Sequence, residues 1–258
     1  MAWERYIFHR EIFTNYPGGD DKKITKAEAA LFAQNNIKIV SIFQEGSYNP
    51  ATFNYAKGAD DATRAIAAAK NLNQPSNTPI FFGVEINVSN DNSEEQIIQQ
   101  SIENYLGGVS HTLNDLSINT RTYKLGIYGP KARCKKIIEE LYPDAYSMYG
   151  KPYGYGNSYS GWTIKQDIEP DGYTGSLVGS VDFDITRTSS YGGWLYHAYP
   201  DNWTNYGNAE KHRKKCLYCN HYTYQYHVPD SMGMRCTVCG YVGPISVPAN
   251  NIEEEDDE

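Results

Sequence analysis

The most apolar run in the chain is TPIFFGVEINV, at residues 78–88, and it is hydrophobic at successive positions rather than at alternate ones. A strand in the middle of a parallel sheet has this pattern, because helices cover both of its faces. We therefore predict a central parallel strand. Its one carboxylate, Glu85, lies near the carboxyl end, where parallel sheets and barrels bind their ligands. The alternative is that Glu85 accepts backbone hydrogen bonds or pairs with a nearby arginine.

Similar runs occur near residues 6, 40, 126, 147, 165 and 182, which brings the predicted number of strands to seven. Helical patterns separate the first five strands, and the first helix is predicted to begin after Thr25, which forms a capping box with Glu28. This alternation is typical of parallel βαβ units. Seven strands are one fewer than a closed (β/α)8 barrel needs. The alternative, a doubly wound open sheet, lacks its glycine-rich phosphate-binding turn after the first strand.

The rest of the chain differs in composition from residues 1–195. Residues 196–213 have little apolar periodicity and predict a linker, residues 214–245 a small cysteine-containing module, and residues 246–258, which end in EEEDDE, a solvated and disordered acidic tail. The tail supplies much of the net charge of −8, so the body of the protein is close to neutral. Because the large domain has no basic stripe, we do not expect it to bind nucleic acid.

No run approaches the roughly 18 consecutive apolar residues of a membrane span, and the N-terminal segment MAWERYIFHR lacks the apolar core of a signal peptide. The sequence therefore predicts no membrane span and leaves the compartment open. Tyrosine is the compositional outlier, with 23 residues against 8 phenylalanines and 4 tryptophans. Tyrosine rings suit sugar faces and protein interfaces, but we expect many of these rings simply to pack in the large domain.

Four cysteines of the C-terminal module form two C-x2-C pairs. They are Cys216 with Cys219 and Cys236 with Cys239, and residues 220–235 separate the pairs. Four thiolates at this spacing predict a structural zinc ribbon, in which each pair gives two sulfurs to one tetrahedral ion. Two disulfides, or an iron site of the rubredoxin type, are the alternatives.

Three histidines near these cysteines, His212, His221 and His227, are also possible ligands. Because four cysteines are available, we expect the histidines to have surface or packing roles. The loop between the two pairs is aromatic and mildly basic, so the module offers a docking surface for protein, wall polymer or nucleic acid. The fifth cysteine, Cys134, lies in a predicted lysine-rich helix and is expected to be an unpaired thiol.

The order of several segments resembles a known family. Over roughly residues 4 to 194, the chain is similar in the order and spacing of its segments to the glycoside-hydrolase-like TIM-barrel family related to the family 25 lysozymes. The segments that carry this resemblance are RYIF, ITKAEAALFAQNNIKIVSIFQ, GADDATRAIAAAKNL, PIFFGVEIN, YKLGIYGP and VDFD. The resemblance implies an α/β fold, a (β/α)8-type TIM barrel over residues 1–195, with no cofactor for catalysis. Members of this family begin with a strand that carries an aspartate. It is missing before RYIF, so we expect that it precedes this sequence, comes from another chain or has been lost.

The resemblance places the catalytic residues on two strands. Family members carry two acidic residues, two positions apart, on the strand that matches PIFFGVEIN, and here these positions hold Glu85 and Asn87. In the related lysozymes the second is the proton-donating glutamate, which an amide cannot replace. In VDFD, period two puts Asp182 and Asp184 on one face, where two like charges raise one of the two pKa values. We therefore predict catalytic roles for Glu85, Asp182 and Asp184; the alternative is that one aspartate pairs with Arg187 or caps the turn.

Further residues are predicted to contact substrate at the same end of the barrel, with packing as the alternative: Gln44, Glu45, Asn87, Tyr128, Trp162 and Gln166. The resemblance implies a glycoside hydrolase that acts on or binds a bacterial cell-wall glycan such as peptidoglycan, outside the cell or at the wall. Because of Asn87 and the missing strand, the alternative is a pseudoenzyme that binds glycan or protein within a larger wall-associated or phage-like assembly. A third hypothesis makes the zinc ribbon the functional unit and the barrel its scaffold.

Overall fold

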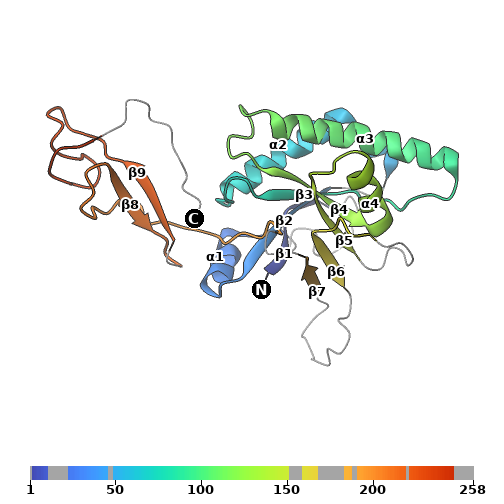
Figure 1. Cartoon of the computed structure of the whole chain (residues 1–258), viewed down its shortest axis with the longest axis horizontal. Helices are drawn as coiled ribbons and strands as arrows, with labels where there is room; N and C mark the ends of the chain where they lie inside the picture. Colours follow the sequence, from blue (N-terminus) through green and yellow to red (C-terminus); the bar gives the residue numbers. More distant parts are fainter. Residues whose placement is uncertain are drawn as a thin grey trace, which may run out of the picture. The chain divides into compact units, whose positions relative to one another are not determined.

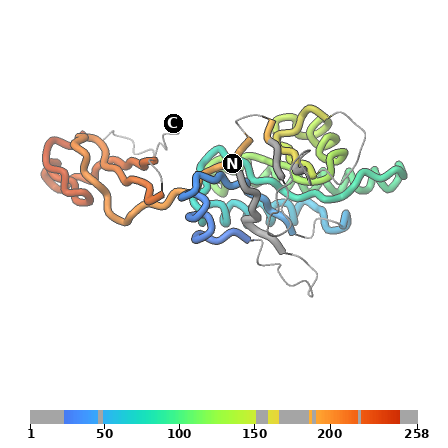
Figure 2. The backbone as a smooth tube through the Cα atoms, turned by 90° about the horizontal axis from the view of Figure 1, so that it is seen from below, coloured from blue at the N-terminus to red at the C-terminus, as the bar shows by residue number. Residues whose placement is uncertain are grey.

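The computed structural model describes residues 2–10, 23–45, 49–150, 159–167, 183–187, 191–218 and 221–246 of the 258-residue chain (Figure 1). The chain divides into two compact units, Met1–Phe32 with Asn36–Tyr196 and Ala33–Asn35 with His197–Glu258. We call the first the barrel unit and the second the C-terminal unit. Figure 2 traces the backbone of both, with the chain after residue 197 in orange and red.

A seven-stranded sheet organises the barrel unit, and its strands lie side by side in chain order (Figure 1). The strands predicted from the sequence are confirmed, and those from the first to the sixth run parallel. Their bounds are β1 (Ala2–Arg10), β2 (Lys38–Glu45), β3 (Pro79–Gly83), β4 (Lys124–Pro130), β5 (Tyr146–Gly150), β6 (Ile164–Asp167) and β7 (Phe183–Thr186). This mixed α/β architecture is consistent with a TIM-barrel-like fold.

The predicted central strand is confirmed as β3, which pairs with β2 on one side and β4 on the other. All five of its residues are buried, which explains why the run is apolar at successive positions. The strand ends at Gly83, so Glu85 lies in the connection that follows it.

The last strand differs from the expectation that every strand would continue a parallel barrel. β7 pairs antiparallel to β6, and within the described residues β1 and β7 are the two edges of the sheet. The apolar pattern of a strand is compatible with either direction, so the antiparallel pairing of β7 is not contained in the sequence of the strand itself.

Four α-helices connect the first five strands: α1 (Lys26–Gln34), α2 (Tyr55–Asn71), α3 (Asn92–Asn114) and α4 (Lys131–Glu140), with a 3-10 turn, η1 (Pro50–Thr52), before α2. The predicted cap of α1 is confirmed, because Thr25 Oγ1 accepts a hydrogen bond of 3.1 Å from the Glu28 N–H. Asn54 and Asp91 cap α2 and α3 in the same way.

Helices α2 and α3 approach each other closely through two glycines. A Cβ on Gly58 would lie 1.9 Å from the Tyr105 carbonyl oxygen, and a Cβ on Gly108 would lie 2.1 Å from the Tyr55 carbonyl oxygen. Any larger residue would therefore push the helix backbones apart. The two helices cover one face of the sheet together with α4 (Figure 1).

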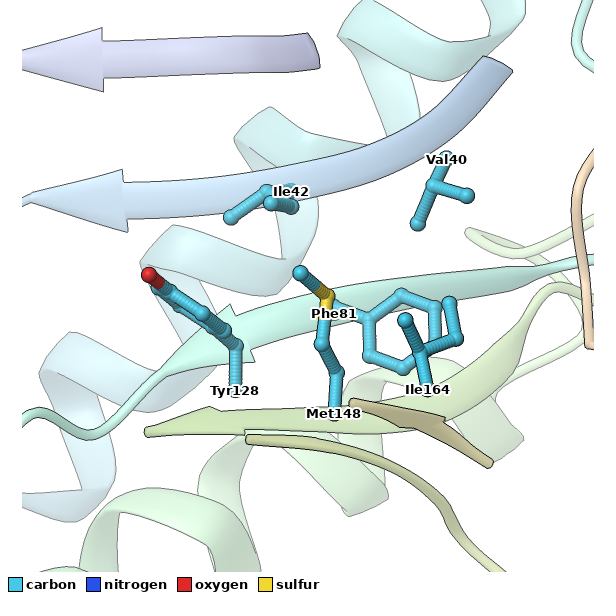
Figure 3. Packing of buried hydrophobic residues seen from close by; sticks show 6 residues of the cluster. All are labelled: Val40, Ile42, Phe81, Tyr128, Met148 and Ile164. Carbon is cyan, nitrogen blue, oxygen red and sulfur yellow. The ribbon is translucent and has the colours of Figure 1, made fainter. Parts of the chain in front are cut away.

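The opposite face of the sheet carries a separate apolar cluster (Figure 3). The helix-covered face is identified by Phe43, whose ring lies 5.4 Å from the Arg64 guanidinium of α2. Because side chains alternate along a strand, Ile42 projects to the other face, which we call the inner face. The cluster there consists of Val40, Ile42, Phe81, Tyr128, Met148 and Ile164.

The chain returns to the sheet after β7 through Trp194. Its backbone exchanges two hydrogen bonds with Ile39, and its Nε1–H donates to Ser41 Oγ at 2.9 Å. Ser41 in turn donates to Gln74, which is also buried. β3 pairs with β2 only from Ser41 onward, and Trp194 pairs with Ile39, nearer the start of β2.

Cys134 is a free thiol in α4 and is completely buried. Burial raises its pKa to about 12, although a hydrogen bond with Ser147 partly opposes this. We predict that thiol reagents will leave Cys134 unmodified in the folded protein and modify it in denaturant, because the thiolate is the reactive form. Peptide mapping after alkylation would measure this, and rapid modification of Cys134 without denaturant would contradict it.

The C-terminal unit contains an antiparallel hairpin of β8 (Lys211–Lys215) and β9 (Tyr222–Tyr226). Residues before the hairpin pack on it, because Thr204 pairs with Arg213 and the Trp203 ring stacks on His212 with centroids 4.3 Å apart. In the described part of the chain, no helix combines the length and the apolar character that crossing a bilayer requires.

Candidate functional site

The carboxylate of Glu85 lies against the end of the neighbouring strand. Gln44, the last residue but one of β2, donates a hydrogen bond from Nε2 to Glu85 Oε2. Gln44 is buried, and Glu85 is half-buried. Gly83 leaves space for the glutamine, because a Cβ at that position would lie 3.1 Å from Gln44 Cγ. The structure therefore brings together two of the predicted site residues at the carboxyl edge of the sheet.

Tyr128 lies beside the same edge. It pairs with Gly83 in the sheet, and its carbonyl oxygen accepts a 2.7 Å hydrogen bond from the N–H of Val84, the residue before Glu85. The ring belongs to the cluster on the inner face and is 7% exposed (Figure 3). Tyr128 thus packs against the core while its backbone fixes the start of the connection that carries Glu85.

Two other predicted positions occur at the carboxyl end of β6 and the start of β7. The backbone of Gln166 pairs with that of Asp184, two residues beyond Ile164 of the inner cluster. Asp182 lies outside the described residues. The sheet register therefore places Gln166 and Asp184 directly opposite each other on neighbouring strands. The roles predicted for them stay predictions.

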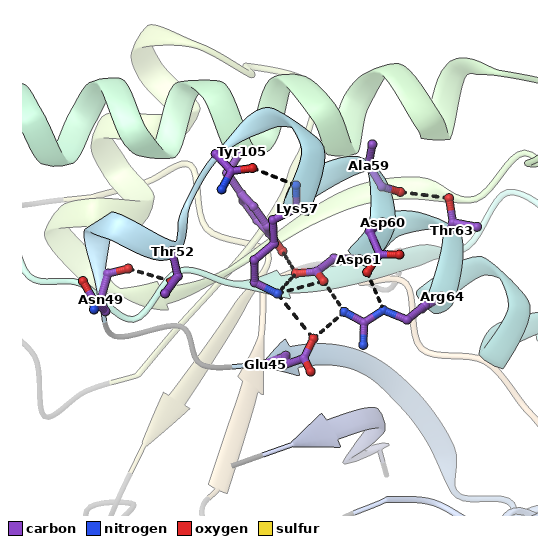
Figure 4. Close-up of polar contacts among 11 residues, drawn as sticks. Glu45, Asn49, Thr52, Lys57, Ala59, Asp60, Asp61, Thr63, Arg64 and Tyr105 are labelled. Atoms are coloured by element: carbon purple, nitrogen blue, oxygen red, sulfur yellow. Dashed lines mark hydrogen bonds and ion pairs between the residues drawn. The ribbon is translucent and has the colours of Figure 1, made fainter. Parts of the chain in front are cut away.

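Glu45 is separated from its neighbour on β2, because successive side chains project to opposite faces. Its carboxylate pairs with Lys57 at 3.3 Å and with Arg64, both on α2, and these cations also bind Asp61 (Figure 4). Burial raises the pKa of Glu45, but the hydrogen bonds and charges of Arg64 and Lys57 outweigh it and lower the pKa. The structure thus places this carboxylate in a polar cluster that joins α2 to the sheet.

The connection after Glu85 is held by Arg133, which the sequence did not single out. This arginine is completely buried, and it donates to the carbonyl oxygens of Ile86 at 3.1 Å and Asn87 at 3.0 Å. It also forms two hydrogen bonds with Glu95, of 2.8 and 2.9 Å. The Asn87 side chain is exposed. The sequence feature that could have identified Arg133 is a cation between two apolar residues in the first turn of α4.

Trp162 lies apart from the other predicted substrate contacts. It precedes β6 and is therefore at the amino end of that strand, whereas Gln166 is near the carboxyl end. Its half-buried ring meets Tyr149 edge to face, with centroids 6.2 Å apart. Tyr149 alternates with Met148 of the inner cluster, so this contact belongs to the helix-covered side of the sheet.

A second candidate site lies within the C-terminal unit. One ligand atom each from His212, His227, Cys236 and Cys239 lies within 4.8 Å of the others, so the group can hold a metal ion. Cys216 is buried but does not belong to the group, and Cys219, its predicted partner, lies outside the described residues. The cysteines that the structure describes are free thiols. The structure thus adds two histidines, for which we expected other roles, to two of the four predicted cysteine ligands.

The environment of Cys236 favours the form that binds metal. Burial raises the pKa of its thiol, but hydrogen bonds from the backbone N–H groups of Cys239 and Val238 outweigh burial and lower the pKa to about 5. At neutral pH the thiolate is therefore the favoured form, and thiolates are the ligands that zinc takes from cysteine.

A partial parallel barrel with a carboxylate beside the carboxyl end of its central strand defines a TIM-barrel-like protein with a candidate site at the edge where such barrels bind their ligands. Residues 5–226 match the family model described as Rv2525c-like, glycoside hydrolase-like domain, and the chain belongs to this family. The expected glycoside-hydrolase-like family is thereby confirmed, whereas the link to the family 25 lysozymes stays a prediction.

Two relatives come from Bacillus subtilis and are both described as uncharacterized. FadG is 27% identical over 180 residues, which cover 67% of this chain and 30% of FadG. YbfG is 27% identical over 168 residues, which cover 61% of this chain and 21% of YbfG. The chain thus spans less than a third of the length of these relatives.

A solved structure with a similar fold is that of the Mycobacterium tuberculosis Tat-secreted protein Rv2525c in complex with L-tartrate. Its TM-score is 0.53 at 21% sequence identity, and the match covers 74% of this chain and 87% of that one. At this identity the likeness establishes the fold.

Proposed function

We propose that the barrel unit binds a bacterial cell-wall glycan at the carboxyl edge of its sheet. The observation that carries this proposal is the hydrogen bond between Gln44 and Glu85, which holds a carboxylate at the edge where parallel barrels bind their ligands. Carboxylate and amide groups suit the hydroxyl groups of a sugar, which both donate and accept hydrogen bonds. Secretion of the mycobacterial relative supports a location outside the cell.

We further propose that the site hydrolyses the glycan in the manner of a lysozyme. Hydrolysis needs one carboxylic acid to protonate the leaving oxygen and a second carboxylate as nucleophile or electrostatic stabiliser. The Gln44 amide donates to the Glu85 carboxylate and holds it at the edge of the sheet. We assign Glu85 the role of proton donor or electrostatic stabiliser, with Asp182 or Asp184 as its partner.

The second candidate function is glycan or protein binding without hydrolysis, in a larger wall-associated or phage-like assembly. It is favoured by Asn87, because this exposed amide is at the position that the resemblance to the family 25 lysozymes assigns to the proton donor. The greater length of the Bacillus relatives also fits a barrel that works within a larger protein.

Release of soluble sugar from purified peptidoglycan distinguishes the two functions. If the site is hydrolytic, Glu85→Gln and Asp182→Asn should each lower the rate at least about 100-fold, the effect typical of removing a group that acts in the transition state. Glu139→Gln changes an exposed carboxylate of α4 and should leave the rate unchanged. If the parent and all variants release sugar at equal rates, the proposed site is wrong. If the protein sediments with peptidoglycan but releases no sugar, the result supports binding without hydrolysis.

For the C-terminal unit we propose a structural zinc ion, which would tie the hairpin to the loop of residues 236–239. The support is a set of two thiols and two imidazoles, which are the groups that zinc prefers in structural sites.

A further inference from the structure

The four polar side chains of the metal group come from separate parts of the C-terminal unit. His212 is in β8, His227 follows β9, and Cys236 and Cys239 lie on a later loop. The two histidines and Cys236 are at most 2% exposed. Polar groups are seldom buried together in so small a unit unless they bind one another or a shared ligand.

Two nitrogen-to-sulfur separations in the group match those around one tetrahedral zinc ion. The Nδ1 atom of His212 lies 3.6 Å from Cys236 Sγ, and the Nδ1 atom of His227 lies 3.4 Å from Cys239 Sγ. Zinc bonds of about 2.3 Å to sulfur and about 2.0–2.1 Å to nitrogen, at a tetrahedral angle, give a nitrogen-to-sulfur separation of about 3.6 Å. Both observed pairs are close to this value.

In both histidines the Nε2 atom contacts a protein oxygen, and the Nδ1 atom faces a cysteine sulfur. His227 Nε2 lies 2.9 Å from the Asn208 carbonyl oxygen. Because a carbonyl only accepts, Nε2 is the donor in this contact, and Nδ1 is the nitrogen that faces Cys239. His212 Nε2 faces Gln225 Oε1 at 3.5 Å in a similar arrangement. Metal-bound histidines commonly have such a partner on the other nitrogen.

Aromatic rings hold both imidazoles in place. Trp203 stacks on His212 with centroids 4.3 Å apart, and Tyr241 stacks on His227 with centroids 4.8 Å apart. These rings restrict rotation of the imidazoles and exclude water from one side of each. Cys216 Sγ accepts a hydrogen bond from the Tyr218 N–H at 3.4 Å and is not among the ligand atoms that lie within 4.8 Å of one another.

We infer that the zinc ion proposed above is bound by His212 Nδ1, His227 Nδ1, Cys236 Sγ and Cys239 Sγ, a mixed two-histidine, two-cysteine set. This set replaces the four-thiolate ribbon suggested by the two C-x2-C pairs, and Cys216 is not a ligand. Cys219 lies outside the described residues, and a complete four-ligand set predicts that it is not a ligand either. The ligand set rests on the proposed zinc site but not on the glycan proposal.

The test is the zinc content of the full-length protein, purified under reducing conditions and measured by mass spectrometry of the metal. The parent should carry one zinc per chain. His212→Gln and His227→Gln should lose most of it, whereas Cys216→Ser and Cys219→Ser should keep it. A parent without zinc would refute the metal site itself. Loss of zinc in the Cys216 and Cys219 variants, with retention in the histidine variants, would refute only the ligand set.

A second measurement does not depend on whether the histidine variants fold. Cobalt substituted for zinc in the parent should give the thiolate-to-metal absorption of two sulfurs, and Cys216→Ser should leave its intensity unchanged. An intensity that corresponds to four sulfurs, and that falls by about a quarter in Cys216→Ser, would overturn the inference in favour of four thiolates.

Discussion

Replacing Arg133 with methionine should lower the free energy of unfolding by about 3–5 kcal/mol, the usual cost of leaving a buried charge without its partner. Methionine keeps much of the side-chain length but provides none of the five bonds that the guanidinium makes to Glu95, Gln99, Ile86 and Asn87. Lys136, at 3.1 Å from Glu95, partly compensates, so we expect the lower end of that range. Urea denaturation followed by fluorescence would measure the change.

Lys135→Met is the matched control for this prediction. Lys135 is on the same helix and pairs with Glu139, but the two side chains are 33% and 51% exposed. An exposed pair at this spacing contributes about 0.3–0.5 kcal/mol, so the control should change stability little. A loss below about 1 kcal/mol in the Arg133 variant would contradict the assigned role.

The ion pair between Arg133 and Glu95 makes the free energy of unfolding depend on pH. Burial raises the pKa of Glu95, but hydrogen bonds from Arg133, the Ser89 N–H and Lys136 outweigh it and lower the pKa below the ordinary 4.5. The stability that the pair contributes is therefore present above pH 4.5 and is lost as the pH falls through the lowered pKa. The difference between parent and Arg133→Met should shrink in acid, because protonated Glu95 no longer needs a cation. A difference that grows in acid would contradict this explanation.

Gly108→Ala should destabilise the protein by about 1–3 kcal/mol, the usual cost of overpacking. The added methyl group would lie 2.1 Å from the Tyr55 carbonyl oxygen, so α2 and α3 would have to separate. Gly107→Ala is the control, because its methyl group would lie 3.8 Å from the nearest atom of the Tyr55 ring. Since alanine favours a helix over glycine by about 1 kcal/mol, the control should be neutral or stabilising. Melting temperatures would compare the two, and equal effects would contradict the close approach of the helices.

Arg133 also connects stability to the candidate site. It binds the carbonyl oxygens of Ile86 and Asn87, which directly follow Glu85. A carboxylate that serves a binding site has to be held by its supporting structure, and here a buried guanidinium provides that support on one side while Gln44 provides it on the other. If the barrel unit binds glycan as proposed, Arg133→Met should weaken its sedimentation with peptidoglycan even at temperatures where the variant remains folded.

Much of the fold of the barrel unit could be predicted because its signals are local. The apolar run around Phe81 identified the central strand, and the Thr25 cap marked the start of α1. The direction of β7 could not be predicted, because it depends on which edge the returning chain meets and not on the composition of the strand. The resemblance named the correct glycoside-hydrolase-like family because order and spacing of many segments were compared together.

The sequence by itself determined the alternation of strands and helices, the position of Glu85 beside the central strand and the two C-x2-C pairs, because each follows from periodicity or spacing over a few residues. Only the tertiary structure decided that Gln44 binds Glu85, 41 residues away, while Glu45 turns to α2. It alone joined Arg133 to Glu95 and grouped His212 with Cys236. These contacts depend on sheet register and on the packing of distant segments, which no short stretch of sequence contains.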